Sequence, residues 1–216
     1  HLLITMPAES QAIVIINSSD ADLSDRLVVT GSDNADRFLL TATGTDANAT
    51  GMIQLREFRR GQTGLFDAMR VLHQGVEAVE INSRGGDDRF AVRTLHARTT
   101  LNTGAGNDAI YVGSNATLGD LGQPDTNTGG NLNAINALLT INGQGSADSD
   151  LLDLDDTTDT NSNHGTLTST RITNGVVGSG TTLRLFAAGG SITYGTLESL
   201  VIHLGGSAGQ CNAFTV

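Results

Sequence analysis

The sequence predicts an all-β protein, and three observations lead to that class. Helical signals are nearly absent, because no window keeps apolar residues at i, i+3, i+4 and i+7 over three turns. Short runs rich in Val, Ile, Leu, Thr and Phe recur instead, separated by Gly, Asp, Asn and Ser. One phrase also repeats along the chain: an apolar strand, a Gly-containing turn with an acidic residue, and a second apolar strand. We therefore expect a parallel β-solenoid, either a right-handed β-helix or a β-roll-like fold, with loop excursions.

Eight short apolar runs are the clearest predicted strands. Each consists mainly of residues that favour extended backbone, and turn-forming residues border it. The runs occupy residues 12–16, 26–30, 37–42, 78–82, 89–93, 109–112, 138–142 and 199–203.

The repeated phrase gives the expected coil length. Its copies span residues 27–40, 79–92, 101–112, 139–152 and 201–216, and their marker residues are Asp36, Asp88, Asp108, Asp148 and Asn212. The markers are separated by 52, 20, 40 and 64 residues, which are close to small multiples of about 20. About 20 residues per rung is therefore expected. In the fourth copy, alignment favours Asp148 as the marker and the strand pattern favours Asp150, so both remain open.

A longer duplication suggests internal units within one elongated domain covering residues 1–216. Residues 31–40 match 143–152 without gaps, and residues 76–81 match 197–202. We infer tandem units at about 27–92 and 139–216, joined by 93–138. Residues 119–133 lack apolar periodicity and are expected to be either a loop that leaves the coil or the boundary between two units, and residues 154–166 are expected to be a second loop excursion.

Charge excludes two classes of partner. The formal net charge is −11, and all 12 basic residues are Arg. Nucleic-acid binders and proteins that lie on anionic lipid need clustered positive charge, so neither partner is expected. No apolar stretch approaches the roughly 18–20 residues that span a bilayer, so no membrane insertion is expected. The 23 acidic residues comprise 18 Asp and 5 Glu, a bias typical of turns and of hard-cation sites.

Two of the turns carry a family resemblance. TGAGNDAIY places Gly104, Gly106, Asp108 and Ile110 in the pattern G-G-x-G-x-D-x-U-x, and SRGGDDRFA keeps Gly86, Asp88 and Phe90. These turns resemble the hemolysin-type, or repeats-in-toxin, calcium-binding repeat. The resemblance implies Ca²⁺ bound between successive coils. Residues 139–216 also resemble a degenerate tandem module of large secreted bacterial proteins, which implies an extracellular or cell-surface location.

Two groups of residues are candidate calcium ligands. Asp87 and Asp88 lie 20 residues before Asn107 and Asp108, so stacked rungs would bring the two turns together. Asp153, Asp155, Asp156 and Asp159 form the densest acidic cluster. The alternatives are that the turn residues bond their own backbone N–H groups, and that the cluster is a solvated loop.

Catalytic signals are few, and the expected function is structural. His73, His96, His164 and His203 are dispersed and are expected at the surface or at strand ends; no nucleophile elbow or phosphate loop is present. We expect an extracellular surface, adhesive or filament-forming module that associates end to end or with neighbouring modules of a longer chain, and calcium bound at its turns would stabilise it. One alternative is a calcium-binding stalk. The other is a polysaccharide-cleaving enzyme that combines Asp87 or Asp88 with Arg84, Arg89 and Arg93.

Cys211, the single cysteine, cannot form an internal disulfide.

Overall fold

The fold is all-β, as predicted. The computed structural model describes residues 2–5, 12–18, 25–44, 49–58, 65–120, 123–144, 147–177, 181–206 and 212–216, which excludes Cys211. These residues form 18 strands and contain no helix. Consequently none of them belongs to a helix that is long and apolar enough to cross a membrane.

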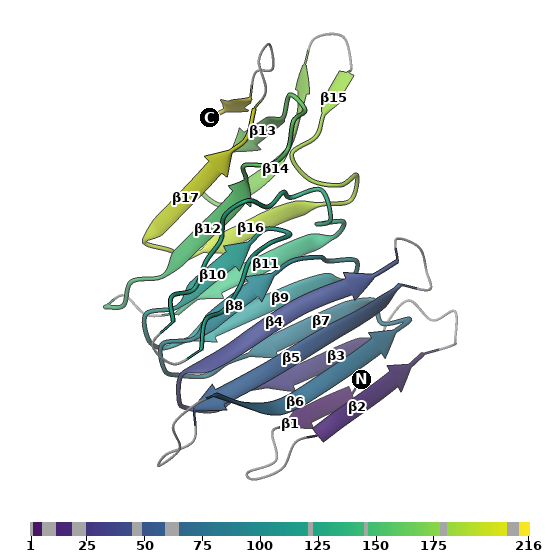
Figure 1. Cartoon of the computed structure of the whole chain (residues 1–216), viewed down its shortest axis with the longest axis vertical. Coiled ribbons are helices and arrows are strands. Elements are labelled where there is room, and N and C mark those ends of the chain that lie inside the picture. The colour runs from purple at the N-terminus through teal and green to yellow at the C-terminus, as the bar shows by residue number, and fades with distance from the viewer. Residues whose placement is uncertain are drawn as a thin grey trace.

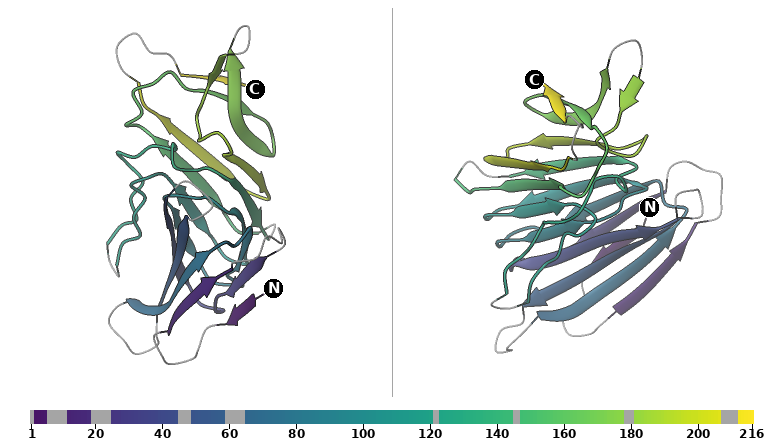
Figure 2. Two further views of the ribbon diagram at one scale, coloured as in Figure 1. Left: turned by 90° about the vertical axis from the view of Figure 1, so that its right-hand side faces the viewer. Right: turned by 45° about the horizontal axis from the view of Figure 1, so that its top comes forward.

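The strands form two sheets that face each other (Figure 1). Sheet A has ten strands, in the order β1 (Leu2–Thr5), β3 (Arg26–Thr30), β7 (Ala78–Asn82), β9 (Arg98–Gly104), β11 (Leu138–Gly143), β16 (Ser191–Gly195), β14 (Arg171–Val177), β13 (His164–Leu167) and β18 (Ala213–Thr215), with β15 (Thr181–Leu183) paired to β14. Sheet B has eight, in the order β17 (Ser199–Leu204), β12 (Leu151–Asp156), β10 (Ala109–Val112), β8 (Arg89–Val92), β4 (Asp36–Thr43), β5 (Thr50–Phe58), β6 (Leu65–Gln74) and β2 (Ala12–Asn17). Figure 2 shows the two layers from the side.

Five strand–turn–strand units, which we call rungs, connect the sheets. In each rung a strand of sheet A leads through a turn into a strand of sheet B: β3–β4, β7–β8, β9–β10, β11–β12 and β16–β17. Equivalent strands of successive rungs pair in parallel. The turns of successive rungs are 52, 20, 42 and 48 residues apart along the chain. Only one step therefore has the predicted 20 residues, because longer excursions separate the other rungs.

Antiparallel strands make both sheets mixed, which the sequence did not predict. Between the first two rungs, β5 pairs antiparallel with both β4 and β6 and extends sheet B. Between the last two rungs, β14 pairs antiparallel with β13, β15 and β16 and extends sheet A. Uniformly parallel pairing was thus wrong for these segments. Apolar alternation predicts a strand but does not distinguish a parallel partner from an antiparallel one.

All eight predicted strands are confirmed, with ends that shift by one residue at most. The predicted loop at 154–166 is wrong at its two ends, because β12 continues to Asp156 and β13 begins at His164. The two predicted tandem units each contain two rungs and one antiparallel excursion. Their division into units stays a prediction.

The core lies between the sheets and consists of aligned rows of aliphatic and aromatic side chains. Phe38 and Phe90 occupy the same row of sheet B and stack with ring centroids 5.0 Å apart. On the outer face of sheet A, Asn142 donates to Asn102 over 2.8 Å, and Asn102 donates to Asn82 over 2.6 Å. Such amide rows repeat one side-chain hydrogen bond from strand to strand. The parallel register therefore aligns equivalent side chains both inside the core and outside it.

Both sheets begin and end with strands that run in the same direction. In sheet B, β2 is parallel to β6, and β6 and β4 are both antiparallel to β5, so β2 runs the same way as β4 and β17. In sheet A, β13 and β16 are both antiparallel to β14, and β18 is parallel to β13. The edge strands β1 and β18 consequently share one direction as well.

Candidate functional site

A row of carboxyl groups joins the turns of all five rungs. The backbone N–H of Asp36 donates to Asp88 Oδ1 over 2.7 Å, and that of Asp88 donates to Asp108 Oδ1 over 2.8 Å. The N–H of Asp108 donates to Asp150 Oδ1 over 2.9 Å, and that of Asp150 donates to Glu198 Oε2 over 2.8 Å. We call Asp36, Asp88, Asp108, Asp150 and Glu198 the carboxyl ladder.

The ladder replaces backbone hydrogen bonds at the place where the chain turns into sheet B. The N–H groups of Ala109, Leu151 and Ser199 donate to the backbone carbonyls of Asp88, Asp108 and Asp150 over 2.9–3.0 Å, as in a normal parallel pair. The N–H groups of Asp88, Asp108 and Asp150, each at the last position before a sheet B strand, donate instead to a side-chain carboxyl of the next rung. A buried N–H without an acceptor is costly. An acidic residue at this position therefore satisfies the backbone of the neighbouring rung.

The four aspartates of the ladder are too buried and too close together to ionise normally. Asp36, Asp88, Asp108 and Asp150 expose no more than 1% of their surface. Two unit charges roughly 5 Å apart repel by about 3 kcal/mol at an effective dielectric constant near 20. Burial, reinforced by the neighbouring carboxyls, raises the pKa of Asp88 to about 8 and that of Asp108 to about 7. Burial likewise raises the pKa of Asp36 to about 6.

The second carboxyl oxygens fit this protonated form. The Oδ2 atoms of Asp88, Asp108 and Asp150 are buried and accept no hydrogen bond. The Ser83 hydroxyl lies beside Asp88 but donates to the carbonyl oxygen of Thr103. A carboxylic acid needs an acceptor, rather than a donor, at its protonated oxygen, and the hydroxyl oxygen of Ser83 supplies one. Asp88 is therefore mostly neutral at pH 7, and dissolved substrate cannot reach the four buried aspartates, whereas Glu198 at the end of the ladder is exposed.

Glycines in the turns explain part of the calcium-repeat pattern through packing. Gly104 has φ +88°, and a Cβ atom there would lie 1.8 Å from the carbonyl oxygen of Arg84. Gly106 has φ +131°, and its Cβ would lie 2.2 Å from the carbonyl oxygen of Gly86. Only glycine fits such close backbone contact at positive φ. The G-x-G spacing thus allows the second and third turns to stack.

The other predicted ligands of these turns are bound to neighbouring protein groups. Asp87 Oδ1 accepts the N–H of Asn107 over 2.9 Å, and Asn107 Oδ1 accepts the N–H of Ser149 over 2.8 Å. Arg89 donates to the backbone carbonyls of Asp88 and Asn107 over 2.8 and 2.7 Å. The Arg89 guanidinium therefore donates hydrogen bonds to carbonyl oxygens that would otherwise be candidate ligands for a cation at these two turns.

Most oxygens of the acidic cluster at 153–159 bind loop backbone and side chains. Asp155 accepts N–H groups from Gly130 and Thr157 over 2.5 and 3.1 Å. Asp156 accepts the N–H of Leu132 and the amide of Asn163, Asp159 accepts from Asn133 and Asn161, and Asp153 accepts from Asn127. Burial raises the pKa of Asp156 to about 6. The cluster is therefore not a freely solvated loop, because it attaches the preceding excursion to β12.

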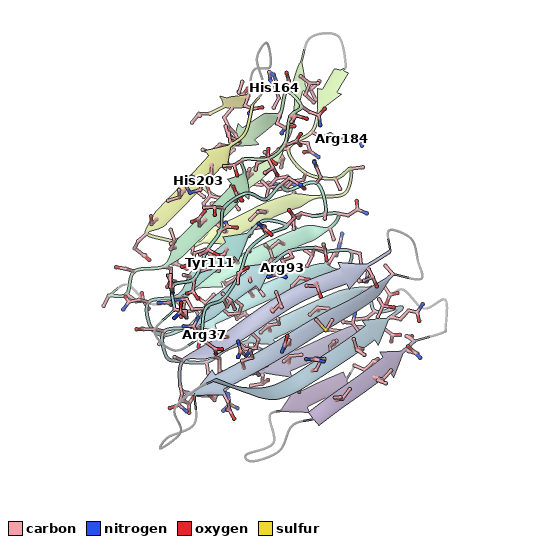
Figure 3. All side chains as sticks on the ribbon, viewed as in Figure 1. Arg37, Arg93, Tyr111, His164, Arg184 and His203 are labelled. Carbon is pink, nitrogen blue, oxygen red and sulfur yellow. The ribbon has the colours of Figure 1, made fainter. Side chains whose placement is uncertain are left out.

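The remaining part of that excursion lies across the outer face of sheet B. Asp125 pairs with Arg37 over 2.5 Å and with Arg89 over 3.5 Å, and it accepts the N–H of Gly119 over 2.9 Å. Arg93 donates to the carbonyl of Ala116 over 2.6 Å. Figure 3 shows Arg37, Arg93 and Tyr111 on this part of the molecule. The arginines considered for polysaccharide cleavage on this face, Arg89 and Arg93, thus bind the protein's own loop, and Arg84 lies at the stacked turn.

Two histidines come together that the sequence treats as dispersed. The rings of His73 and His96 stack with centroids 5.7 Å apart, and Nδ1 of each is buried without a partner. Of the two positions expected for these histidines, His73 occupies a strand end, one residue before the end of β6, and it is buried there rather than exposed. Burial and the adjacent His96 lower the pKa of His73 to about 4, so the pair is neutral at pH 7. His203 Nε2 lies 3.5 Å from Asp153 Oδ1.

Sequence reasoning found part of the ladder. It identified Asp36, Asp88 and Asp108, and the contact to Asp108 selects Asp150 over Asp148 in the fourth copy. It missed Glu198, because it placed the last copy of the phrase at residues 201–216, after the turn that holds this residue. Asn212, the marker of the last copy, makes an analogous contact by accepting the N–H of Asn163 over 2.7 Å, but between β13 and β18 in sheet A.

Comparison with protein-family models, with curated proteins and with solved structures finds no match. Within the described part of the chain, no three His, Cys, Asp or Glu side chains converge to hold a metal ion. Calcium binding at either predicted group stays a prediction.

Proposed function

We propose that the chain is an extracellular structural module, built as a right-handed parallel β-solenoid with antiparallel excursions, that stacks end to end with further copies or with neighbouring modules of a longer chain. The observation that carries the proposal is the common direction of the edge strands. β2 and β17 run the same way in sheet B, as do β1 and β18 in sheet A. A second module translated along the axis would therefore continue both sheets in parallel.

The edge chemistry of β17 supports this proposal. Ser199 and Gly205 donate their N–H groups to carbonyls of Asp150 and Asp156, on the β12 side. Because N–H directions alternate along a strand, the N–H groups of Leu200, Ile202 and Leu204 face the other side, where no strand of the described residues pairs. A row of free N–H and C=O groups is a template for another strand.

The inaccessibility of the ladder also favours a structural role over catalysis. Its acids satisfy backbone N–H groups, and the neighbouring Arg89 and Arg93 bind the protein itself. Calcium enters this proposal only as a possible additional stabiliser of the turns. The midpoint of thermal unfolding in EDTA, followed by excess Ca²⁺, tests it: a clear rise supports bound calcium, and an unchanged midpoint removes it from the proposal.

Sedimentation across a wide concentration range, with electron microscopy of the same samples, tests end-to-end association. We expect the mass to grow with concentration and single-file particles to form. Ile202→Pro removes one edge N–H but no hydrogen bond to β12, and it should keep the protein monomeric. Ile202→Val, the matched control, keeps that N–H and should associate like the wild type. A wild type that stays monomeric throughout, or an Ile202→Pro variant that still associates, would refute self-association through this edge.

A further inference from the structure

A long groove crosses the starts of the sheet A strands. Its volume is about 990 Å³. Its lining includes Ala78, Arg98, Leu138 and Ser191, which are the first residues of β7, β9, β11 and β16. Because the four strands are neighbours in sheet A, the groove runs along the stacking direction for roughly 14 Å. It lies at the opposite ends of these strands from the carboxyl ladder.

Two arginines without partners give this groove positive charge. Arg98 begins β9 and Arg171 begins β14; both are exposed and line the groove. Within the described residues neither side chain has an ion pair or hydrogen bond, whereas Arg26, Arg37, Arg56 and Arg89 each pair with a carboxylate. Among the lining residues that the structure describes, Glu77 is the one acidic side chain, and its carboxylate accepts the N–H of Asp25 over 3.1 Å. Local charge is therefore positive on a chain whose net charge is −11.

The spacing of these arginines suits an extended ligand. Arg171 lies opposite Thr193 on β16, and Arg98 lies two strands before β16 in sheet A. This register separates their Cα atoms by roughly 15 Å. One small anion cannot contact both guanidinium groups, but a linear ligand with repeated anionic groups can. A guanidinium binds a carboxylate through two parallel hydrogen bonds.

The groove lining favours a sugar chain over a peptide. Ala78, Ala97, Ala137 and Gly189 line it, together with Asn136 and Ser191, and the imidazole of His96 is the one aromatic ring among the described lining residues. Peptide-binding grooves recognise alternate side chains through separate pockets, whereas small residues beside amide and hydroxyl groups suit hydroxyl-rich rings. Asn136 uses its Oδ1 atom to accept the N–H of Gly189, which leaves its amide N–H groups for a ligand.

We propose that this groove binds a linear acidic polysaccharide, with Arg98 and Arg171 each holding one carboxylate of the glycan. The site is separate from the edge strands, so glycan binding does not depend on end-to-end association. An anionic surface glycan would thereby contact the side of the module.

Calorimetric titration with a short oligogalacturonate, in EDTA so that calcium cannot bridge ligand and protein, tests the proposal. The wild type should bind, and binding should weaken as salt is raised. Arg98→Ala with Arg171→Ala should weaken binding at least about tenfold, because two charge-assisted contacts are lost. Arg84→Ala with Arg184→Ala removes the same charge from two exposed arginines outside the groove and should change binding less than about twofold. All four side chains are exposed, so thermal midpoints should match.

Three results would overturn the proposal. The first is a wild type that does not bind at low salt. The second is an equal loss of affinity in both double variants, which would indicate general charge attraction. A poly-glutamate peptide that binds more tightly than the oligogalacturonate, with the same dependence on Arg98 and Arg171, would assign the groove to an acidic peptide instead.

Discussion

At the scale of single residues, Asp88 shows why this chain places acids in its turns. Its backbone N–H donates to Asp108, and its own Oδ1 accepts the N–H of Asp36. One carboxyl oxygen is thus an obligatory acceptor, while Oδ2 is buried without a donor. A neutral acid meets both conditions, and a charged one does not. The side chain acts as a substitute for backbone at the bend.

The variant Asp88→Asn tests this protonated form. Asparagine keeps the acceptor for Asp36 and is neutral at every pH, so it removes the cost of holding a proton that the unfolded chain releases. We subtract the wild-type free energy of unfolding from that of the variant at each pH. This difference should be larger at pH 8 than at pH 5 by roughly 2–4 kcal/mol, because only the wild type loses stability as Asp88 ionises. Denaturant unfolding at both pH values measures the difference.

Asp87→Asn is the matched control, because the adjacent carboxyl is exposed. It should change the free energy of unfolding by less than about 0.5 kcal/mol at either pH. If Asp88→Asn instead destabilises the protein more at pH 8 than at pH 5, Asp88 is charged in the fold and the neutral ladder is wrong.

At the scale of elements, the stacked turns depend on close backbone contact. Gly104→Ala would place Cβ 1.8 Å from the Arg84 carbonyl oxygen at φ +88°, and we expect a loss of about 3 kcal/mol or more. Gly195→Ala is the control, because that glycine also ends a strand of sheet A and its Cβ would meet nothing within 4 Å. It should change stability by less than about 0.5 kcal/mol in thermal melts. Equal effects of the two variants would show that the turns do not stack as described.

Asp125 is the carboxylate that joins the excursion to two arginines of sheet B. Asp125→Asn leaves Arg37 and Arg89 without their shared carboxylate beneath the loop, and removing one partner of a largely buried ion pair costs about 3 kcal/mol. Limited proteolysis within residues 113–133 should become at least about tenfold faster. Asp120→Asn breaks the exposed pair with Arg56 on the same loop and should leave the cleavage rate within about threefold of the wild type. Unchanged proteolysis of Asp125→Asn would mean that other contacts hold the loop.

At the scale of the whole molecule, the sequence predicted what repeats locally. Alternation located strands such as β3 and β10, and the spacing of Asp36, Asp88 and Asp108 anticipated stacked turns. The directions of β5 and β14 were not predictable, since the sequence pattern of a strand does not show which neighbouring strand it pairs with in the fold. The same holds for Asp155 and Asp156, whose donors come from residues about 25 positions earlier.

The pH dependence of overall stability tests the carboxyl ladder most directly. Asp88 and Asp108 have folded pKa values raised to about 8 and 7, above those of the unfolded chain, so they bind protons more tightly in the fold. Their stabilisation is complete at low pH and is lost as pH rises through the folded values. His73, with its pKa lowered to about 4, acts in the opposite sense, but only below about pH 6.5.

Free energies of unfolding should therefore be measured from pH 6.5 to 8 in EDTA, where the contribution of His73 is small and opposite in sign. The ladder predicts a fall of about 2 kcal/mol across this window, and a smaller fall in Asp88→Asn. A wild-type stability that is constant or rises over the same window would contradict the raised pKa values of the buried carboxyls of Asp88 and Asp108 in the ladder.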